Sequence, residues 1–227
     1  SVQDYSSPDS DDSTWRILSL PHDWSIEGDF SLDNPSTPGG GALPGGIGWY
    51  RKTFTLPETD RDKVIYVDFD GVYRNSEVWI NGHSLGFRPN GYVSFRYDLT
   101  PYLRYGSQPN VIAVKADNSE QPNSRWYSGS GIYRNVWLVK VNPVHVDNWG
   151  TFVHDMKISS EEATFALEVR IRNSSEADRE AEVSTSIYDD RNKVVTASVT
   201  TLLRVPYTPV TTPVCGRHLS IISSRSQ

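Results

Sequence analysis

The strongest constraint on the fold of this chain is a series of short stretches in which apolar and polar residues alternate. Such alternation places successive side chains on opposite faces of an extended strand. Asn81-Gly82 and Asn90-Gly91 separate some of these stretches, and Asn-Gly favours the type I′ turn of a β-hairpin. One helical turn is expected at 99–103. The strands predicted in the first part of the chain are 15–20, 48–56, 64–69, 77–80, 92–95, 110–116 and 135–141.

Short strands with almost no helix predict an all-β protein. Tryptophan nearly disappears after Asn142-Pro143, which indicates a domain boundary there. We therefore expect a jelly-roll β-sandwich over 1–142, followed by an immunoglobulin-like β-sandwich over 143–227. The second domain is expected to be incomplete, because fewer than the usual ~100 residues remain. Its tail from about Leu202 has no Asp or Glu, which we interpret as a truncation or an out-of-frame end, or alternatively as a natural mobile tail.

The composition limits the partners of this chain. Its 227 residues carry a formal charge of -6 and no cluster of Lys or Arg, which disfavours a nucleic-acid partner. No apolar run approaches the ~18 residues of a membrane span. The single cysteine, Cys215, excludes an internal disulfide, and the histidines lack metal-ligand spacing, so we expect neither metal nor cofactor. A periplasmic or secreted location is expected in preference to the cytoplasm, although Ser1 to Ser13 contain no signal peptide.

An aromatic and cationic run precedes the last strand of the first domain. Arg125, Trp126 and Tyr127 are followed by Gly129 and Gly131, which allow a tight turn. Aromatic rings stack on the apolar face of a pyranose, and a guanidinium donates two hydrogen bonds to its hydroxyls. We therefore predict that Arg125, Trp126 and Tyr127 bind a substrate such as a sugar. The alternative is a turn with buried aromatic rings, which we favour for the alternating Tyr133 and Trp137.

Other candidate sites are better explained structurally. His22 and Asp23 are adjacent on an extended segment and point in opposite directions, so we expect Asp23 to accept backbone hydrogen bonds while Trp24 packs the loop. Residues 39–48 are rich in glycine but lack the following Lys-Ser/Thr of a phosphate loop, so we predict a loop over the sugar cleft. Asp68 and Asp70 share a strand face about 7 Å apart and are interpreted as solvated residues. We expect no catalytic residue in this chain.

The order of several motifs resembles the N-terminal sugar-binding domain of glycoside hydrolase family 2, in its β-galactosidase-like branch. These motifs are Asp12-Ser13-Thr14-Trp15, Leu20-Pro21-His22-Asp23-Trp24, Gly48-Trp49-Tyr50-Arg51-Lys52, Val78-Trp79-Ile80-Asn81-Gly82 and Ser130-Gly131-Ile132-Tyr133-Arg134-Asn135-Val136. The segment after residue 142 resembles the start of the family's immunoglobulin-like domain. The resemblance implies a retaining glycosidase whose (β/α)8 barrel carries the two catalytic carboxyl groups. Its acid/base glutamate lies in an Asn-Glu pair, which this sequence lacks, so the chain alone is expected to be inactive.

The resemblance also implies that the loop of Arg125, Trp126 and Tyr127 shapes the substrate pocket of the barrel. In better-known galactosidases an aspartate occupies the position of Arg125 and contacts substrate hydroxyls. A donor therefore replaces an acceptor here, and a guanidinium suits a uronate, a sulfate or a barrel carboxylate at least as well. Two alternatives stay open: a free-standing carbohydrate-binding module, and a β-sandwich that mediates protein contacts.

Overall fold

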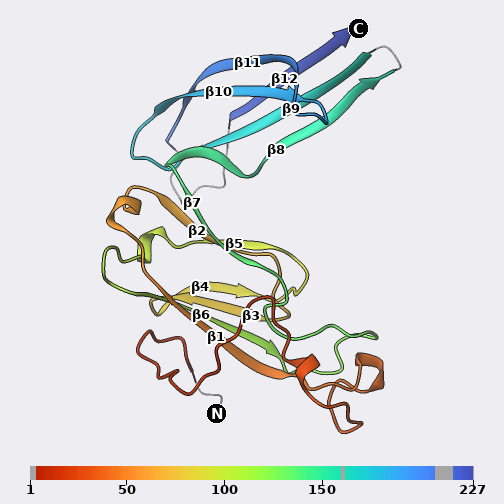
Figure 1. The fold of residues 1–227 in the computed structure, drawn as a ribbon. Helices are drawn as coiled ribbons and strands as arrows, with labels where there is room; N and C mark the ends of the chain where they lie inside the picture. The colour runs from red at the N-terminus through yellow and green to blue at the C-terminus, as the bar shows by residue number, and fades with distance from the viewer. Residues whose placement is uncertain (1–3, 160–161, 208–216, 227) are drawn as a thin grey trace. The chain divides into compact units, whose positions relative to one another are not determined.

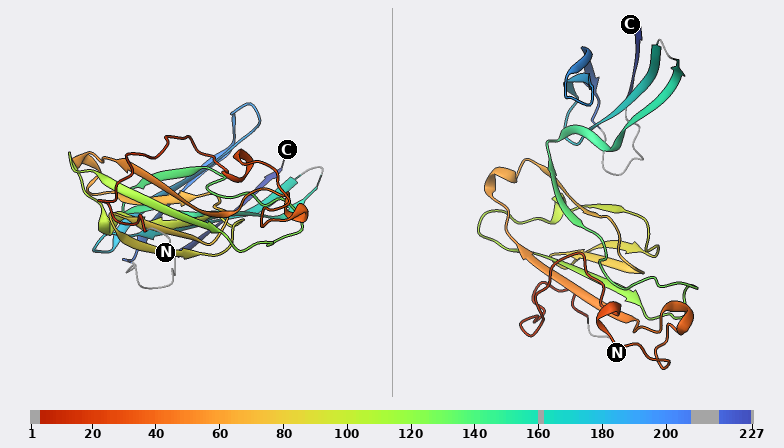
Figure 2. Two further views of the ribbon diagram at one scale, coloured as in Figure 1. Left: turned by 90° about the horizontal axis from the view of Figure 1, so that it is seen from below. Right: turned by 45° about the vertical axis from the view of Figure 1, so that its right-hand side comes forward.

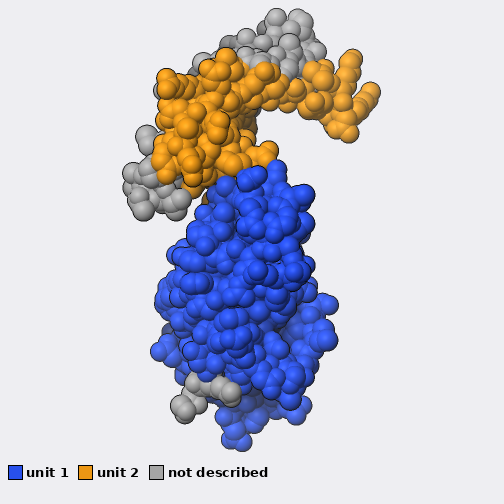
Figure 3. All heavy atoms as spheres, turned by 90° about the vertical axis from the view of Figure 1, so that its left-hand side faces the viewer, with its two compact units in different colours: residues 1–140 blue, residues 141–227 orange. Residues whose placement is uncertain are grey.

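The computed structural model describes residues 4–159, 162–207 and 217–226. It contains two compact units, Ser1–Lys140 (unit 1) and Val141–Gln227 (unit 2), which Figure 3 shows in different colours. The described residues form twelve strands and only four short 3-10 turns. The predicted all-β class is therefore confirmed.

Two antiparallel sheets make up unit 1, and Figure 1 shows them as stacked layers. One sheet has the order β1-β6-β3-β4, with β1 Gly46–Phe54, β6 Asn110–Asn118, β3 Ser76–Ile80 and β4 His83–Arg88. The other has the order β5-β2-β7, with β5 Phe95–Asp98, β2 Val64–Phe69 and β7 Val136–Val141. β1 and β4 are the edge strands of the first sheet, and β5 and β7 are the edge strands of the second.

The core of unit 1 lies between these two sheets. Alternation along β3 buries Val78 and Ile80, and these side chains belong to one cluster with Phe69 of β2 and Val114 of β6. Since both sheets contribute to a single cluster, burial of apolar area from both faces stabilises the sandwich. Phe69 also stacks on Phe95, with ring centroids 4.9 Å apart.

The two Asn-Gly pairs have different structures. Asn81 and Gly82 take φ values of 50° and 82° and join β3 to β4, which confirms the predicted hairpin turn. The hairpin predicted at Asn90-Gly91 is wrong, because β4 and β5 belong to different sheets and residues 89–94 connect them. Neither residue of this second pair has positive φ. The same dipeptide therefore serves once as a hairpin turn and once as a crossover between layers.

Two further expectations for unit 1 are corrected. Residues 15–20 form no strand and follow an irregular path. Trp137, which was expected in the core, is 54% exposed, and its indole Nε1 donates to Asp70 Oδ2 at 3.0 Å. Its neighbour Val136 packs against the core instead. The burial pattern along β7 does not alternate regularly, since the adjacent Trp137 and Leu138 are both exposed, and a periodic pattern alone does not say which residues face inward.

Unit 2 also contains two sheets, seen from a second direction in Figure 2. The three-stranded sheet has the order β12-β9-β8, with β8 Val144–Ile158, β9 Glu162–Asn173 and β12 Arg217–Ser226. The other pairs β10 Arg179–Tyr188 with β11 Val194–Val205. Val169 and Ile171 of β9 pack with Val205 of β11 and so join the two sheets in a small core.

The tail of unit 2 differs from the sequence-based expectation. Its residues from Arg217 to Ser226 pair in regular antiparallel register with Ile171 to Glu162 of β9. A strand thus lies where a mobile tail was one interpretation, and the interpretation as a truncation or an out-of-frame end stays a prediction. Residues 208–216, with Cys215 among them, lie outside the described residues.

The short turns are η1 Ser25–Glu27, η2 Pro38–Gly40, η3 Glu58–Asp60 and η4 Thr100–Tyr102, the last within the predicted turn at 99–103. None of the helical segments among the described residues has the length and apolar character needed to cross a membrane. The same residues contain no group of three or more His, Cys, Asp or Glu side chains placed to hold a metal ion.

Replacing Phe69 with Ala is expected to destabilise unit 1 strongly. Phe69 is 1% exposed and its removal leaves a cavity between the sheets, at a cost of about 3–5 kcal/mol. Phe87→Ala is the matched control, because Phe87 lies on the outer strand β4 and is 52% exposed. Urea unfolding monitored by tryptophan fluorescence measures both changes. Equal losses in the two variants contradict the assignment of the core.

Candidate functional site

Arg125, Trp126 and Tyr127 lie in the loop between β6 and β7, and all three side chains are exposed. Trp126 is 61% exposed and Tyr127 is 42% exposed. No hydrogen bond or ion pair within the described part of the chain involves the Arg125 guanidinium. The structure therefore leaves an indole and a cation facing solvent at the tip of this loop.

The Asp23 carboxylate fixes the base of the loop. Its Oδ1 accepts hydrogen bonds from the backbone N–H groups of Ser25, at 2.9 Å, and Ser130, at 2.8 Å. Its Oδ2 accepts a hydrogen bond from the Tyr127 hydroxyl. The expected structural role of Asp23 as an acceptor of backbone hydrogen bonds is confirmed. The sequence did not indicate the hydrogen bond between Asp23 and Tyr127, which lie far apart in the chain.

A buried polar network lies directly beneath. Asn118, at the end of β6, donates through Nδ2 to Gly129 O at 2.9 Å and to Ser130 Oγ at 2.8 Å. Ser25 Oγ lies 2.7 Å from Ser130 Oγ and 2.6 Å from Pro44 O. Because polar groups that lose water must find partners inside the protein, this closed set of hydrogen bonds makes the loop base rigid. It ties the loop both to β6 and to the segment that begins at residue 25.

Close backbone packing explains one glycine of this loop. Gly131 has φ of 118°, and a Cβ there would lie 2.2 Å from the Tyr50 hydroxyl and 3.0 Å from the Trp24 ring. Trp24 also packs against Gly48, so its expected role in packing the loop is confirmed. Only glycine allows the chain to pass this close to the two rings.

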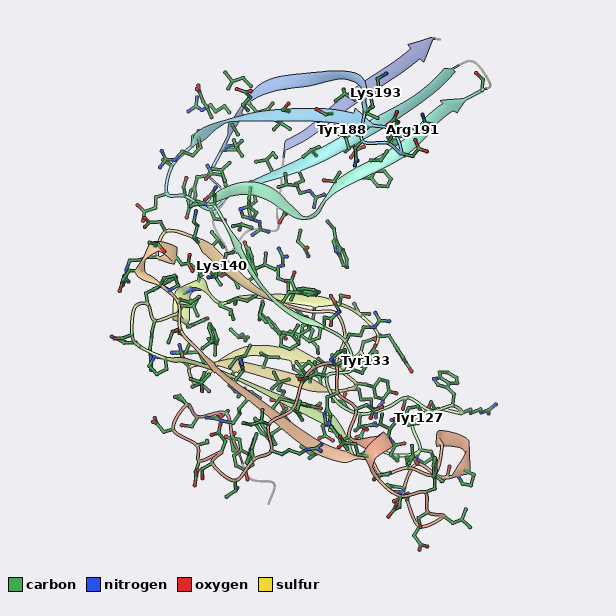
Figure 4. The ribbon with its side chains drawn as sticks, in the orientation of Figure 1. Tyr127, Tyr133, Lys140, Tyr188, Arg191 and Lys193 are labelled. Carbon is green, nitrogen blue, oxygen red and sulfur yellow. The ribbon has the colours of Figure 1, made fainter. Side chains whose placement is uncertain are left out.

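The glycine-rich segment of residues 39–48 lies against the candidate site. A Cβ on Gly41 would lie 3.2 Å from the ring of Tyr127. Figure 4 shows Tyr127 beside these loops and Tyr133 nearer the sheets. The hollow between the loops, lined by Gly40, Gln121, Tyr127 and Ser128, has a volume of about 10 Å³. That is room for about one water molecule and not for a sugar ring.

A larger hollow of about 250 Å³ lies elsewhere in unit 1, between residues 15–24 and β1. Its lining includes Trp15, Trp24, Trp49 and Tyr50, and none of the three predicted site residues. His22 Nδ1 lies 2.8 Å from the Tyr50 hydroxyl. Burial raises the pKa of Tyr50 to about 12, so this hydroxyl stays protonated at neutral pH.

The environment of Tyr127 also favours its protonated form. Burial of part of the ring raises the pKa of the Tyr127 hydroxyl above its ordinary value, and the hydrogen bond to the Asp23 carboxylate raises it further. The hydroxyl therefore donates to Asp23 throughout the physiological range. Tyr127 contributes mainly its ring to the surface, since its O–H is already used.

The match to a family model decides the identity of this domain. Residues 29–142 match the model described as glycosyl hydrolases family 2, sugar binding domain. The chain belongs to glycoside hydrolase family 2. This confirms the resemblance predicted from the order of the sequence motifs.

Individual family 2 relatives support the assignment. The chain is 56% identical over 184 residues to a β-galactosidase of Bacteroides ovatus, covering 81% of this chain and 22% of that protein. It is 33% identical over 208 residues to a β-glucuronidase of Formosa agariphila, covering 82% of this chain and 21% of the relative. The chain thus spans about a fifth of the length of these relatives.

Solved structures show the same fold. A family 2 member from Bacteroides cellulosilyticus matches with a TM-score of 0.85 and 34% identity, over 96% of this chain and 28% of the other. A family 2 β-glucuronidase matches with a TM-score of 0.85 and 27% identity, over 98% of this chain and 25% of the other. The match therefore extends over both units of the chain.

Replacing Asp23 with Ala is expected to destabilise unit 1 by about 2–4 kcal/mol, because two backbone N–H groups and a hydroxyl lose one shared acceptor. The control is Asp33→Ala, since Asp33 is exposed and its carboxylate makes no hydrogen bond in the described structure. Urea unfolding measures both variants. A loss no larger than that of the control contradicts the anchoring role of Asp23.

Stability above pH 10 is expected to depend on Tyr127. A tyrosine with a higher pKa in the folded than in the unfolded state contributes stability that is complete below about pH 10 and is lost as pH rises further. Tyr127→Phe should therefore lose less stability between pH 10 and 12 than the natural chain. Unfolding midpoints in urea at pH 8, 10 and 12 test this. Parallel losses in the two proteins contradict a raised pKa at this site.

Proposed function

We propose that this chain is the N-terminal, non-catalytic part of a longer retaining β-glycosidase of family 2. In that enzyme the loop of Arg125, Trp126 and Tyr127 supplies one wall of the substrate pocket of a (β/α)8 barrel. The observation that supports this is an exposed loop tip on a rigidly anchored base, beside a hollow too small for a sugar. Such a surface needs a second wall before it can enclose a ligand.

Each exposed residue has a chemical task in this proposal. The face of the Trp126 indole offers an apolar surface to the C–H groups of a pyranose. Arg125 directs a fork of N–H donors at hydroxyl or acidic oxygens. Tyr127 supports this side of the pocket with its ring, since its hydroxyl is bound to Asp23. The two carboxyl groups that cleave the glycosidic bond belong to the barrel.

The named relatives include a β-galactosidase and a β-glucuronidase, so we propose a β-galactoside or a β-glucuronide as the substrate. Arg125 favours a substrate with an acidic substituent, because a guanidinium pairs with a carboxylate or sulfate through two parallel hydrogen bonds. Pairing of Arg125 with a carboxylate of the barrel is the competing role. A periplasmic or secreted location stays a prediction from the sequence.

Arg125→Ala and Trp126→Ala in the longer enzyme are each expected to lower kcat/KM about ten- to hundredfold, since each removes contacts worth roughly 1–3 kcal/mol in the transition state. Arg61→Ala is the control, because Arg61 is an exposed arginine paired with Glu58. Assays use 4-nitrophenyl β-galactoside and 4-nitrophenyl β-glucuronide. Unchanged kcat/KM in both variants favours a β-sandwich that only mediates protein contacts.

Calorimetry on the chain alone tests the alternative of a free-standing carbohydrate-binding module. The proposal expects no measurable heat with galactosides or glucuronides, because one wall of a pocket leaves most of the sugar hydrated. A saturable binding signal that Trp126→Ala abolishes indicates a free-standing carbohydrate-binding module instead.

A further inference from the structure

A second exposed aromatic side chain lies beside the predicted site. Tyr92, in the connection between β4 and β5, is 52% exposed, and its hydroxyl oxygen accepts a hydrogen bond from Trp126 Nε1 at 3.2 Å. Two large rings from loops distant in sequence thus meet at the surface of unit 1. Exposed aromatic groups held next to each other are typical of a binding surface.

The backbone around Tyr92 is firmly placed. The carbonyl of Gly91 accepts a hydrogen bond from the Tyr133 hydroxyl at 2.8 Å, and the N–H of Tyr92 donates to Asn90 Oδ1 at 2.8 Å. A Cβ on Gly91 would lie 2.2 Å from the ring of Tyr73, so the chain passes directly over that ring. These contacts fix the backbone at Tyr92, although the Tyr92 ring is exposed to solvent.

One buried residue supports both loops. Tyr73 is 4% exposed, and its ring meets the Tyr92 ring edge-on with centroids 5.4 Å apart. Its backbone exchanges two hydrogen bonds with Gly131, at 2.9 Å and 2.8 Å, at the base of the loop that carries Trp126. Because the same residue contacts both loops, the distance between Tyr92 and Trp126 is set by the core and not by two independent loops.

We propose that Tyr92 and Trp126 form one stacking surface for a sugar ring of the substrate, and that Tyr92 is a substrate-binding residue of this site. The inference rests on the proposed function and extends the site to the β4–β5 connection. Tyr92 holds the indole through its hydroxyl and adds its own ring to the apolar surface. The ligand class is a β-linked pyranoside whose C–H face lies against the two rings.

Tyr92→Ala and Tyr92→Phe separate the two contributions of Tyr92. In the longer enzyme Tyr92→Ala should lower kcat/KM about three- to tenfold, mainly through a higher KM, because one stacking ring is lost. Tyr92→Phe keeps the ring and should change kcat/KM less than Tyr92→Ala does. Val93→Ala is the matched control, since Val93 is the next residue and 54% exposed. Both 4-nitrophenyl glycosides serve as substrates.

A double variant tests whether the two rings act together. The double variant Tyr92→Ala/Trp126→Ala should lower kcat/KM by a smaller factor than the product of the factors for the two single variants, as expected for residues in contact. If Trp126→Ala lowers kcat/KM while Tyr92→Ala behaves like Val93→Ala, this inference fails and the proposed function stands. If Arg125→Ala, Trp126→Ala and Tyr92→Ala all leave kcat/KM unchanged, both fail.

The contact itself is measurable in the 227-residue chain without any activity. Tyr92→Phe removes the acceptor of the Trp126 indole, so its Nε1–H resonance should move in a ¹⁵N–¹H spectrum while the urea midpoint changes little. The Trp126→Phe spectrum assigns that resonance. An indole resonance that stays in place in Tyr92→Phe shows that the two rings are not paired and overturns the inference.

Discussion

The Asp23 carboxylate accepts hydrogen bonds from Ser25, Tyr127 and Ser130, and the geometry of the candidate site depends on them. One short acidic side chain thereby connects the N-terminal segment to a loop more than a hundred residues later. Asn118 and Ser130 extend this contact into a network in which the buried donors and acceptors satisfy one another. Such a network fixes a loop base at little cost, because no polar group is left without a partner.

A rigid base explains why the loop tip can remain open. Trp126 and Tyr92 keep more than half of their surface in water, which is unfavourable for large apolar groups unless another surface covers them in the functional state. The hollow beside Tyr127 holds about one water, so the loops around Tyr127 offer a surface and not an enclosed site. This arrangement suits a domain that contributes one wall of a pocket.

Tyr73, a buried residue of the β2–β3 connection, links the two loops that carry this surface. It is buried in the connection between β2 and β3, it forms an isolated backbone bridge with Gly131, and its ring contacts Tyr92. A change at Tyr73 therefore affects the positions of both exposed aromatic residues. The glycines at 91 and 131 are required for the same reason, since each lets the backbone pass close to an aromatic ring.

Residue pattern alone determined the all-β class, the strands β1, β2, β3 and β6, the turn at Asn81-Gly82 and the family of the chain. The class, the strands and the turn follow from local rules, namely side-chain alternation and turn chemistry. The family follows from the resemblance of its ordered motifs to those of known members. Tertiary structure decided which residues of β7 are buried, and it left Trp137 exposed. It also decided whether an Asn-Gly pair forms a hairpin turn, since residues 89–94 instead connect two different sheets. It also brought Asp23 to Tyr127 and Tyr92 to Trp126. Contacts between distant segments depend on how sheets stack, and no spacing within one segment encodes them.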